Sequence, residues 1–274
     1  LGMAARAAAL ADAYVAEAYD VTSMYWNPAA LVFLQNVSIV ANHFQERDYD
    51  AMNENIAIPL LTSTDGALAI SASVGHLGYI KPSSLAAEFR FIEYGFDIGF
   101  ARTVVPSLSV GTIISLRYGE SKISHLRVAS SSFGVFYSTS PEISYGVAYE
   151  AVGSRIRYSY DASSTTLHRE NSPRNLKLGA VLRLPSSSQR PVIIAAAANE
   201  KSFGERGLRY KAGLEVWPVT FLALRIGYQV DPGRAAARYG MGLRANRLQL
   251  DYAISLSREY DRFQQLSVSI AFWE

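Results

Sequence analysis

From about residue 33 to the C-terminus, apolar and polar residues alternate along the chain with a period of two. In the segment 222–230, for example, every second residue is Leu, Ile, Tyr or Val, and Arg225 and Gln229 lie between them. Such alternation predicts β-strands with one apolar face and one polar face. About fourteen segments of this kind fit into the sequence, which is enough chain for membrane strands of about 9–11 residues and their connections.

The first 32 residues break this pattern, because Ala4–Ala18 is rich in alanine and predicts a short helix. Asp20 and Thr22 end the predicted helix. Asn27-Pro28 then fixes a turn, because a residue before proline is kept out of helical geometry. We therefore predict an all-β fold, a transmembrane antiparallel β-barrel of about fourteen strands formed by residues 33–274, with residues 1–32 as a short helical hatch inside it.

The predicted connections between strands alternate in length. Tight connections include 63–65 and 139–141, whereas longer and more polar ones include 79–87 and 153–174. Short turns at one rim and long loops at the other are typical of outer-membrane barrels. The terminal pair Phe272-Trp273 also favours the membrane, since aromatic side chains settle at the lipid–water interface. The alternative is a soluble barrel whose charged face meets water.

Composition narrows the class of protein further. Charged residues make up 18% of the chain, below the roughly 25% of soluble domains. The net charge is +2 and the basic residues are scattered, so no electrostatic footprint for nucleic acid is present. No cysteine is present to form disulfides or ligate metals, and no apolar run approaches the roughly 18 residues of a transmembrane helix. We expect a bacterial outer-membrane protein, in contact with outer-membrane lipid, whose signal peptide has been removed.

The charged residues of the barrel fall mainly on the face opposite the apolar one. An outer-membrane barrel turns its apolar face to lipid and keeps a polar lumen, so we expect these charges to point inward. Both signs are present and can pair across the interior. The predicted polar network of the lumen comprises Glu93, Asp97, Arg117, Glu150, Lys177, Arg183, Arg209, Lys211, Glu215, Arg225, Arg244 and Asp251.

Both ends of the chain resemble a known family. At the N-terminus the resemblance rests on Gly2 to Leu31, and above all on Tyr25-Trp26-Asn27-Pro28-Ala29. At the C-terminus it rests on the segments 212–215, 222–228, 240–244, 250–253 and 266–272. These residues resemble PorV/PorQ-like proteins, which belong to the FadL superfamily of outer-membrane barrels. The resemblance implies a fourteen-stranded barrel closed by an N-terminal hatch that contains Asn27-Pro28-Ala29.

The resemblance also implies two different functions. FadL-type members move hydrophobic molecules, whereas PorV-type members engage exported proteins beside a larger type IX translocon. The charged inward faces favour the second function, an accessory subunit of a secretion or surface assembly with other proteins as partners. The alternative is a conduit for small hydrophobic ligands. A continuous apolar track in the lumen would favour the conduit, and a filled, salt-bridged lumen would favour the accessory subunit.

Two groups of residues are candidates for the working parts of such a barrel. Trp26, Asn27, Pro28 and Ala29 are expected either to gate a passage or to wedge the hatch against the wall. The long connection 153–174 carries the second group, which suits either a contact surface or a lid over the barrel mouth. Its candidate residues are Tyr158, Tyr160, His168 and Arg169.

The sequence nominates no catalytic site, metal site or cofactor. The segment 240–245 matches a loose dinucleotide-binding pattern, but no helix is predicted to follow it. A Gly-x-Ser-x-Gly nucleophile motif is absent. The four histidines, His43, His76, His125 and His168, lack the spacing of metal ligands. We therefore expect a protein that is not an enzyme.

Overall fold

A computed structural model describes residues 3–35, 37–48, 50–80, 89–121, 124–160, 168–171, 174–185, 191–203, 207–256 and 262–272. Its helices are α1 (Ala5–Ala9), η1 (Val21–Tyr25) and η2 (Pro28–Phe33). Its strands are β1 (Ser38–Glu46), β2 (Ala51–Thr62), β3 (Gly66–Ile80), β4 (Phe89–Val105), β5 (Leu108–Glu120), β6 (Ser124–Ser138), β7 (Ile143–Tyr160), β8 (His168–Asn171), β9 (Arg174–Pro185), β10 (Pro191–Phe203), β11 (Arg209–Val219), β12 (Leu222–Asp231), β13 (Arg234–Ala245), β14 (Leu248–Ser255) and β15 (Phe263–Ala271).

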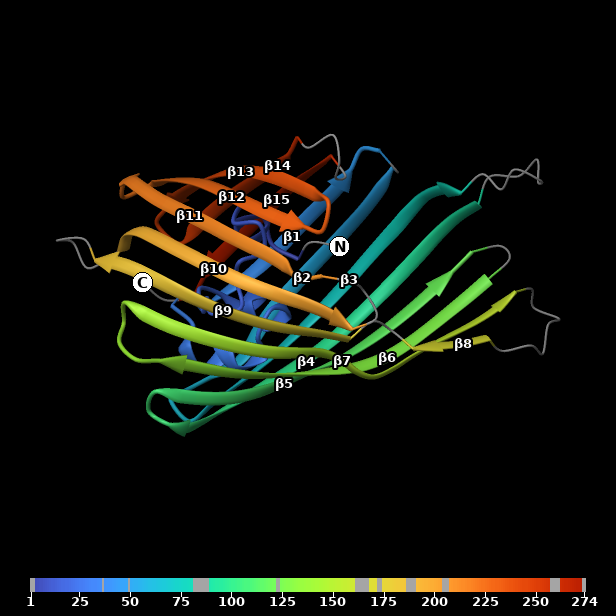
Figure 1. Cartoon of the computed structure of the whole chain (residues 1–274), viewed down its shortest axis with the longest axis horizontal. Helices are drawn as coiled ribbons and strands as arrows, with labels where there is room; N and C mark the ends of the chain where they lie inside the picture. Colours follow the sequence, from blue (N-terminus) through green and yellow to red (C-terminus); the bar gives the residue numbers. More distant parts are fainter. Residues whose placement is uncertain are drawn as a thin grey trace.

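Fourteen of these strands form a closed antiparallel barrel (Figure 1). Consecutive strands of the ring pair with each other, and β1 pairs with β15 along its whole length, which closes the ring. The four-residue β8 extends one rim, where it pairs with β7, while β7 also pairs with β9 to continue the ring. The predicted fold class, a fourteen-stranded barrel with a short N-terminal helix, is confirmed.

The outer surface of the barrel is apolar on all sides. In β12, Leu224, Ile226 and Tyr228 are exposed, whereas Arg225 and Gln229 between them are buried. Large apolar side chains are exposed in the same alternating way along most of the other strands. A wall that faces lipid excludes charged side chains and presents apolar ones, so this surface suits lipid and not water. The protein is therefore a transmembrane barrel of the bacterial outer membrane.

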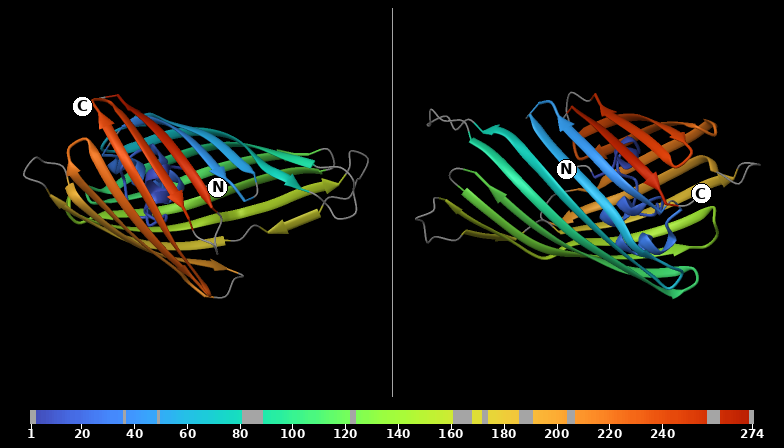
Figure 2. Two further views of the ribbon diagram at one scale, coloured as in Figure 1. Left: turned by 90° about the horizontal axis from the view of Figure 1, so that it is seen from above. Right: turned by 180° about the vertical axis from the view of Figure 1, so that it is seen from behind.

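The two rims differ in height. Between β2 and β3, β4 and β5, β11 and β12, and β13 and β14 the chain turns within two or three residues at one rim. The other rim rises higher on the side of β3–β7, whose strands have 13 to 18 residues, than on the side of β11–β15, whose strands have 8 to 12 (Figure 2). Since tight turns are periplasmic in such barrels, the higher rim faces the outside.

The prediction of a long outer loop at 153–174 was wrong. The strand β7 continues to Tyr160, and its outer end forms a hairpin with β8 in which Tyr158 pairs with His168. The alternating residues after Gly153 extend β7 beyond the part of the barrel that faces lipid. There β8 supplies partners for the backbone hydrogen bonds of β7. The segment 231–235 is polar and predicts another of the longer connections, but it is a turn of two residues between β12 and β13, in which Gly233 adopts a positive φ of 83°.

The predicted helix Ala4–Ala18 is also shorter in the structure, where α1 ends at Ala9. Ala11 and Asp12 have positive φ angles of 54° and 59°, which break the helix. The Asp12 carboxylate accepts a hydrogen bond of 2.6 Å from Arg238 on β13. A tertiary ion pair thus overrides the helical propensity of the alanines. No helix among the described residues is long and apolar enough to cross a membrane.

Candidate functional site: the plugged lumen

The N-terminal segment, residues 3–34, lies inside the barrel and is called the plug here (Figure 1). Two of its three short helices, η1 and η2, begin at a side-chain cap, whereas α1 begins after Ala4 without one. Asp20 accepts from the backbone N–H of Thr22 at the start of η1, and Asn27 accepts from that of Ala29 at the start of η2. Pro28 follows Asn27 at the first position of η2, where its missing N–H is harmless. The plug therefore turns repeatedly across the lumen and does not run along the barrel axis as one helix.

Asn27 ties the plug together and to the wall. Its side-chain amide donates to the carbonyl oxygens of Val15 in the plug and Val135 in β6, each over 2.9 Å. Trp26 packs edge-on against Tyr14 and Tyr25, with ring centroids 5.1 and 6.3 Å apart. Asn27 thus joins the plug to the wall, whereas Trp26 packs within the plug.

The rest of the predicted hatch motif touches β5 and β6 directly. The hydroxyl of Ser109 donates to the carbonyl oxygen of Ala29 over 2.6 Å. A Cβ atom at Gly111 would lie 2.6 Å from the carbonyl carbon of Pro28. The backbone of η2 therefore lies flush against the wall.

The same close approach recurs around the barrel. At eight inward-facing glycines a Cβ atom would come within about 3.1 Å of an atom of the plug, which leaves no room for a side chain. Where β10 and β14 face the plug, they present small residues such as Ala196 and Ala253. We call these eight positions the glycine belt. They are Gly99, Gly111, Gly134, Gly146, Gly179, Gly213, Gly227 and Gly240.

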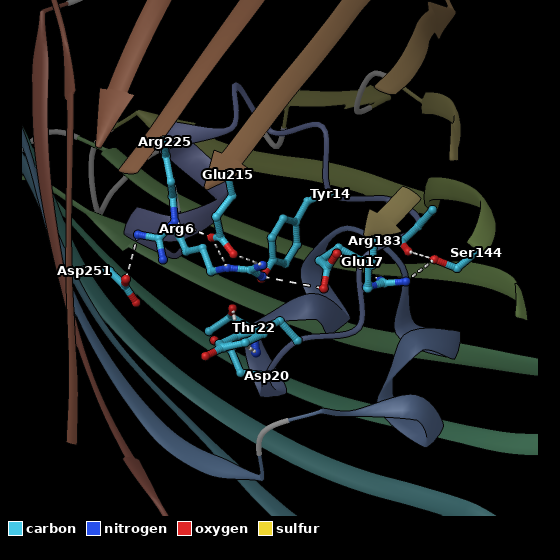
Figure 3. Close-up of polar contacts among 12 residues, drawn as sticks. Arg6, Tyr14, Glu17, Asp20, Thr22, Ser144, Arg183, Glu215, Arg225 and Asp251 are labelled. Carbon is cyan, nitrogen blue, oxygen red and sulfur yellow. Dashed lines mark hydrogen bonds and ion pairs between the residues drawn. The ribbon is translucent and has the colours of Figure 1, made fainter. Parts of the chain in front are cut away.

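Arg6 of α1 is the centre of a buried ionic network (Figure 3). Its guanidinium makes two parallel hydrogen bonds to Glu215 of β11, from Nε over 2.8 Å and from Nη2 over 3.0 Å. It also donates to the hydroxyl of Tyr14 over 2.6 Å. Burial raises the pKa of Tyr14 well above its ordinary value, so the phenol is neutral and does not compete with Glu215 for the charge of Arg6.

The network continues from the plug into the wall on both sides. Arg225 of β12 joins Glu215 over 2.5 Å and Asp251 of β14 over 2.7 Å. On the other side, Arg183 of β9 joins Glu17 of the plug over 3.0 Å and Ser144 of β7 over 2.9 Å (Figure 3). Bidentate arginine–carboxylate pairs are among the strongest polar contacts in proteins. They fix the plug to the β7–β14 side of the wall.

The other predicted lumen residues form two further groups. On β4 and β5, Asp97 pairs with Arg117 over 2.8 Å, and Glu93 is half-buried on the same face of β4. Towards the outer rim, Lys211 and Arg209 pair with Glu200, and Lys177 pairs with Glu150. Arg244 contacts Gln249 of β14 and Tyr19 of the plug.

Sequence reasoning missed the plug's own share of this network. Arg6, Asp12 and Glu17 are charged plug residues that bind the wall, yet the sequence pattern predicts for them only a place in a helical hatch. A signal exists, because these three are the only charged side chains in the segment 3–19, where every other residue is Ala, Leu, Val, Met or Tyr. The other predicted surface, Tyr158, Tyr160, His168 and Arg169, has its backbone in β7 and β8, and its side chains lie outside the described residues. Trp273 also lies outside them.

Comparison with known proteins supports the fold but adds no sequence relative. No protein-family model matches the chain, and no curated protein matches it. Among solved structures, the CymD monoaromatic hydrocarbon channel superposes with a TM-score of 0.70 at 12% identity, over 100% of this chain and 98% of that one. A Pseudomonas aeruginosa FadL homologue gives a TM-score of 0.64 at 13% identity over 98% of each chain.

A third neighbour is the Ralstonia pickettii toluene transporter TbuX. It has a TM-score of 0.63 at 12% identity, over 98% of this chain and 97% of that one. The chain therefore has the fold of FadL-type outer-membrane channels. These neighbours are named as channels and transporters and not as enzymes. The finer PorV/PorQ-like assignment stays a prediction.

Proposed function

We propose that this protein is a conduit for small hydrophobic molecules across the outer membrane, with residues 1–32 as its hatch inside the barrel 33–274. The observation that carries this proposal is a barrel closed by its own N-terminal segment, in a fold shared from end to end with proteins named as hydrocarbon channels. Of the two functions weighed from the sequence, this is the alternative, and the fold favours it.

The two sides of the plug differ in a way that supports the proposal. Towards β7–β14 the plug is held by the ion pairs of Arg6 and Glu17. Towards β1–β5 the contact is mainly apolar, because Val21, Met24 and Leu31 pack against small wall residues such as Ala69 and Ala101. The plug also makes hydrogen bonds there, Asn55 to Tyr25 and Ser109 to Ala29, which involve no charged group. We call this second contact the apolar seam.

The apolar seam is the route that we propose for the solute. Separating the plug from the wall there breaks no ion pair between them among the described residues, and a hydrophobic solute replaces the apolar contacts that are lost. Displacing the opposite side would separate Arg6 from Glu215 and Glu17 from Arg183, and breaking a buried ion pair costs about 3–5 kcal/mol. In this proposal Trp26, Asn27, Pro28 and Ala29 hold the plug at the end of the seam, so that it yields on one side only.

An uptake assay tests this route. The full chain is expressed in the outer membrane of a bacterium without hydrocarbon channels, and entry of labelled toluene is measured. We expect the wild type to raise uptake above the empty vector. Ala69→Leu, which fills the seam, should abolish the gain, and Ala195→Leu on the lipid-facing side of β10 is the matched control. Heat-modifiable gel mobility confirms that each variant is folded. Uptake no faster than that of the empty vector would refute the proposal.

One observation favours the second candidate, an accessory subunit of an outer-membrane assembly. The lumen is crossed by ion pairs at the plug level and towards the outer rim, which suits a barrel that stays closed. Native purification in mild detergent followed by mass spectrometry separates the two functions. A stoichiometric protein partner would identify an accessory subunit, whereas a lone barrel that carries a small apolar ligand would support the conduit.

A further inference from the structure

The lipid-facing wall has a hollow on β15, β1, β2 and β3. Its volume is about 460 Å³, within the range of small-molecule sites. It forms where two outward positions, Ala41 and Ala72, carry small side chains among larger apolar neighbours. Those neighbours include Ile56 and Val268.

An ion pair lies at the outer end of the hollow. His43 of β1 and Glu54 of β2 are direct cross-strand partners, and Nδ1 of His43 is 2.6 Å from Oε1 of Glu54. Their side chains are 36% and 52% exposed on the outward face. Among the described residues neither makes a second hydrogen bond, so Nε2 of His43 and Oε2 of Glu54 are free to bind another group.

The hollow becomes apolar towards the membrane interior. Strand pairing places Ala41, Ile56, Ala72 and Val268 in the row below the ion pair. The next row towards the periplasm consists of isoleucines. They are Ile39, Ile58, Ile70 and Ile270. The hollow therefore has a polar outer end and an apolar inner end.

His43 and Glu54 lie close to the outer rim. The β1–β2 ladder ends at Glu46 and Ala51, three residue pairs beyond His43 and Glu54. The outer rim of such a barrel lies at the membrane–water interface. A charged group there costs about 0–1 kcal/mol, against about 2–4 kcal/mol for a base at the midplane. His43 and Glu54 thus lie where lipid head groups meet acyl chains.

From this arrangement we propose that the hollow binds one outer-leaflet lipid, a lipopolysaccharide molecule, with an acyl chain along the isoleucine row. The acyl chains of lipopolysaccharide carry hydroxyl and amide groups close to the head group. A hydroxyl there donates to Oε2 of Glu54, and a second polar group of the same lipid bonds Nε2 of His43 as donor or acceptor, whichever tautomer the ring adopts. The glycerol esters of a phospholipid at the same depth only accept, and the hydroxyls of phosphatidylglycerol lie further out, beyond its phosphate. This lipid site is separate from the proposed solute route through the lumen.

Native mass spectrometry of the full chain tests the site. The protein is purified in detergent supplemented with short-chain lipopolysaccharide or, separately, with phosphatidylglycerol. We expect one lipopolysaccharide to remain bound to the wild type. Ala72→Leu should remove it by filling the hollow. His43→Leu combined with Glu54→Leu should weaken retention about tenfold, as expected for the loss of hydrogen bonds to a charged group.

The matched control is Ala195→Leu, an outward alanine on β10 far from the hollow in the ring of strands, which should retain the lipid as the wild type does. Folding of every variant is checked by heat-modifiable gel mobility. Equal retention by all variants, equal retention of phosphatidylglycerol, or a protein dimer in place of the lipid adduct would overturn the proposal. None of these results bears on toluene uptake, so the two proposals fail independently.

Discussion

At the scale of single residues, Arg6 is the most consequential side chain of the plug. It is 1% exposed and bound to a carboxylate that is also fully buried. A buried pair of this kind adds little net stability compared with apolar residues of the same shape, but removal of one partner leaves a charge without compensation. Its role is therefore to specify where the plug sits, and its loss should be severe.

We expect Arg6→Gln to lower the free energy of unfolding by about 3–5 kcal/mol, because buried Glu215 loses one of its two guanidinium partners and buried Glu17 loses its ion pair with Arg6. Arg209→Gln is the matched control, since Arg209 is 29% exposed and its ion pairs should contribute about 1 kcal/mol or less. Urea titration in lipid vesicles measures both. Equal destabilisation by the two substitutions would contradict the central role of Arg6.

Asn27 allows a finer test of how the plug is held. Asn27→Asp keeps the acceptor that caps η2 but removes the amide that donates to Val15 and Val135. Asn27→Ala removes both functions. Because a lost cap costs about 1 kcal/mol, we expect Asn27→Ala to lower the stability by that amount plus the cost of the two lost hydrogen bonds.

For Asn27→Asp we expect a cost as large or larger, because its carboxylate would face the carbonyl oxygens of Val15 and Val135 at a buried position. Urea unfolding compares the two variants, and limited proteolysis reports release of the plug. A benign Asn27→Asp would show that the cap alone matters.

At the scale of elements, the plug fits against the wall because the wall has glycine, which lacks a side chain, where the two meet. The glycine belt runs through eight strands and lets the plug backbone approach the strand backbones. At Gly111, Gly146 and Gly227 the fit cannot adjust by rotamer changes, because the plug atoms that would collide with a Cβ belong to the main chain. Strands and plug are therefore matched in register as well as in composition.

Gly227→Ala tests this fit. Its Cβ would lie 2.6 Å from the carbonyl oxygen of Ala9, so we expect the plug to be displaced and cleaved by protease. Gly95→Ala is the control, because there the Cβ would meet the flexible side chains of Ser73 and Arg117. Mass spectrometry of the proteolytic fragments compares them. Equal resistance of both variants would contradict the packing argument.

An exposed ion pair at the outer rim predicts a pH dependence. Arg262 donates to both carboxylate oxygens of Asp48, and these hydrogen bonds lower the pKa of Asp48 below its ordinary value. A lowered carboxyl pKa means that the pair is fully formed above the ordinary value and is lost as the pH falls through the lowered one. The contact joins the β1–β2 turn to the segment before β15.

NMR titration of the Asp48 carboxyl carbon measures this effect. We expect a midpoint below the ordinary value near 3.8 in the wild type. Arg262→Gln should return the midpoint to the ordinary range. An unchanged midpoint in that variant would assign the shift to another group.

At the scale of the whole molecule, the plug closes the barrel by packing inside its lumen. The two sides of the wall differ in how they contact the plug. The ionic side of the plug lies against β7–β14 and the apolar seam lies against β1–β5. The wall around the seam also carries the lipid-facing hollow on its outer surface. The two halves of the barrel therefore differ in their contacts with the plug and with lipid.

Removal of residues 1–34 should convert the closed barrel into an open pore. The glycine belt leaves no side chains to refill the lumen at the plug level, and the remaining charges line a hydrated channel. Planar-bilayer recording should then show ion conductance that the full chain lacks under the same conditions. A closed truncated barrel would show that the strands alone fill the lumen.

The amino-acid sequence by itself determined the strands, the lipid-facing positions and the inward charges. These features depend on a local period of two, and a lipid wall enforces the choice of face at every strand. The alternation in β12 and β14 is as readable in the sequence as in the barrel. The fold of FadL-type barrels, in contrast, is shown by superposition with structures that share only 12–13% of their residues with this chain.

Only the tertiary structure decided how the plug is built and held. The helix that alanine propensity extends to Ala18 stops at Ala9, because Asp12 pairs with Arg238 more than 200 positions away. The pairing of Arg6 with Glu215 and the glycine belt depend on closure of the ring. Contacts between segments so distant in the chain produce no periodic pattern in the sequence. The alternation of a strand, in contrast, can be recognised from adjacent residues.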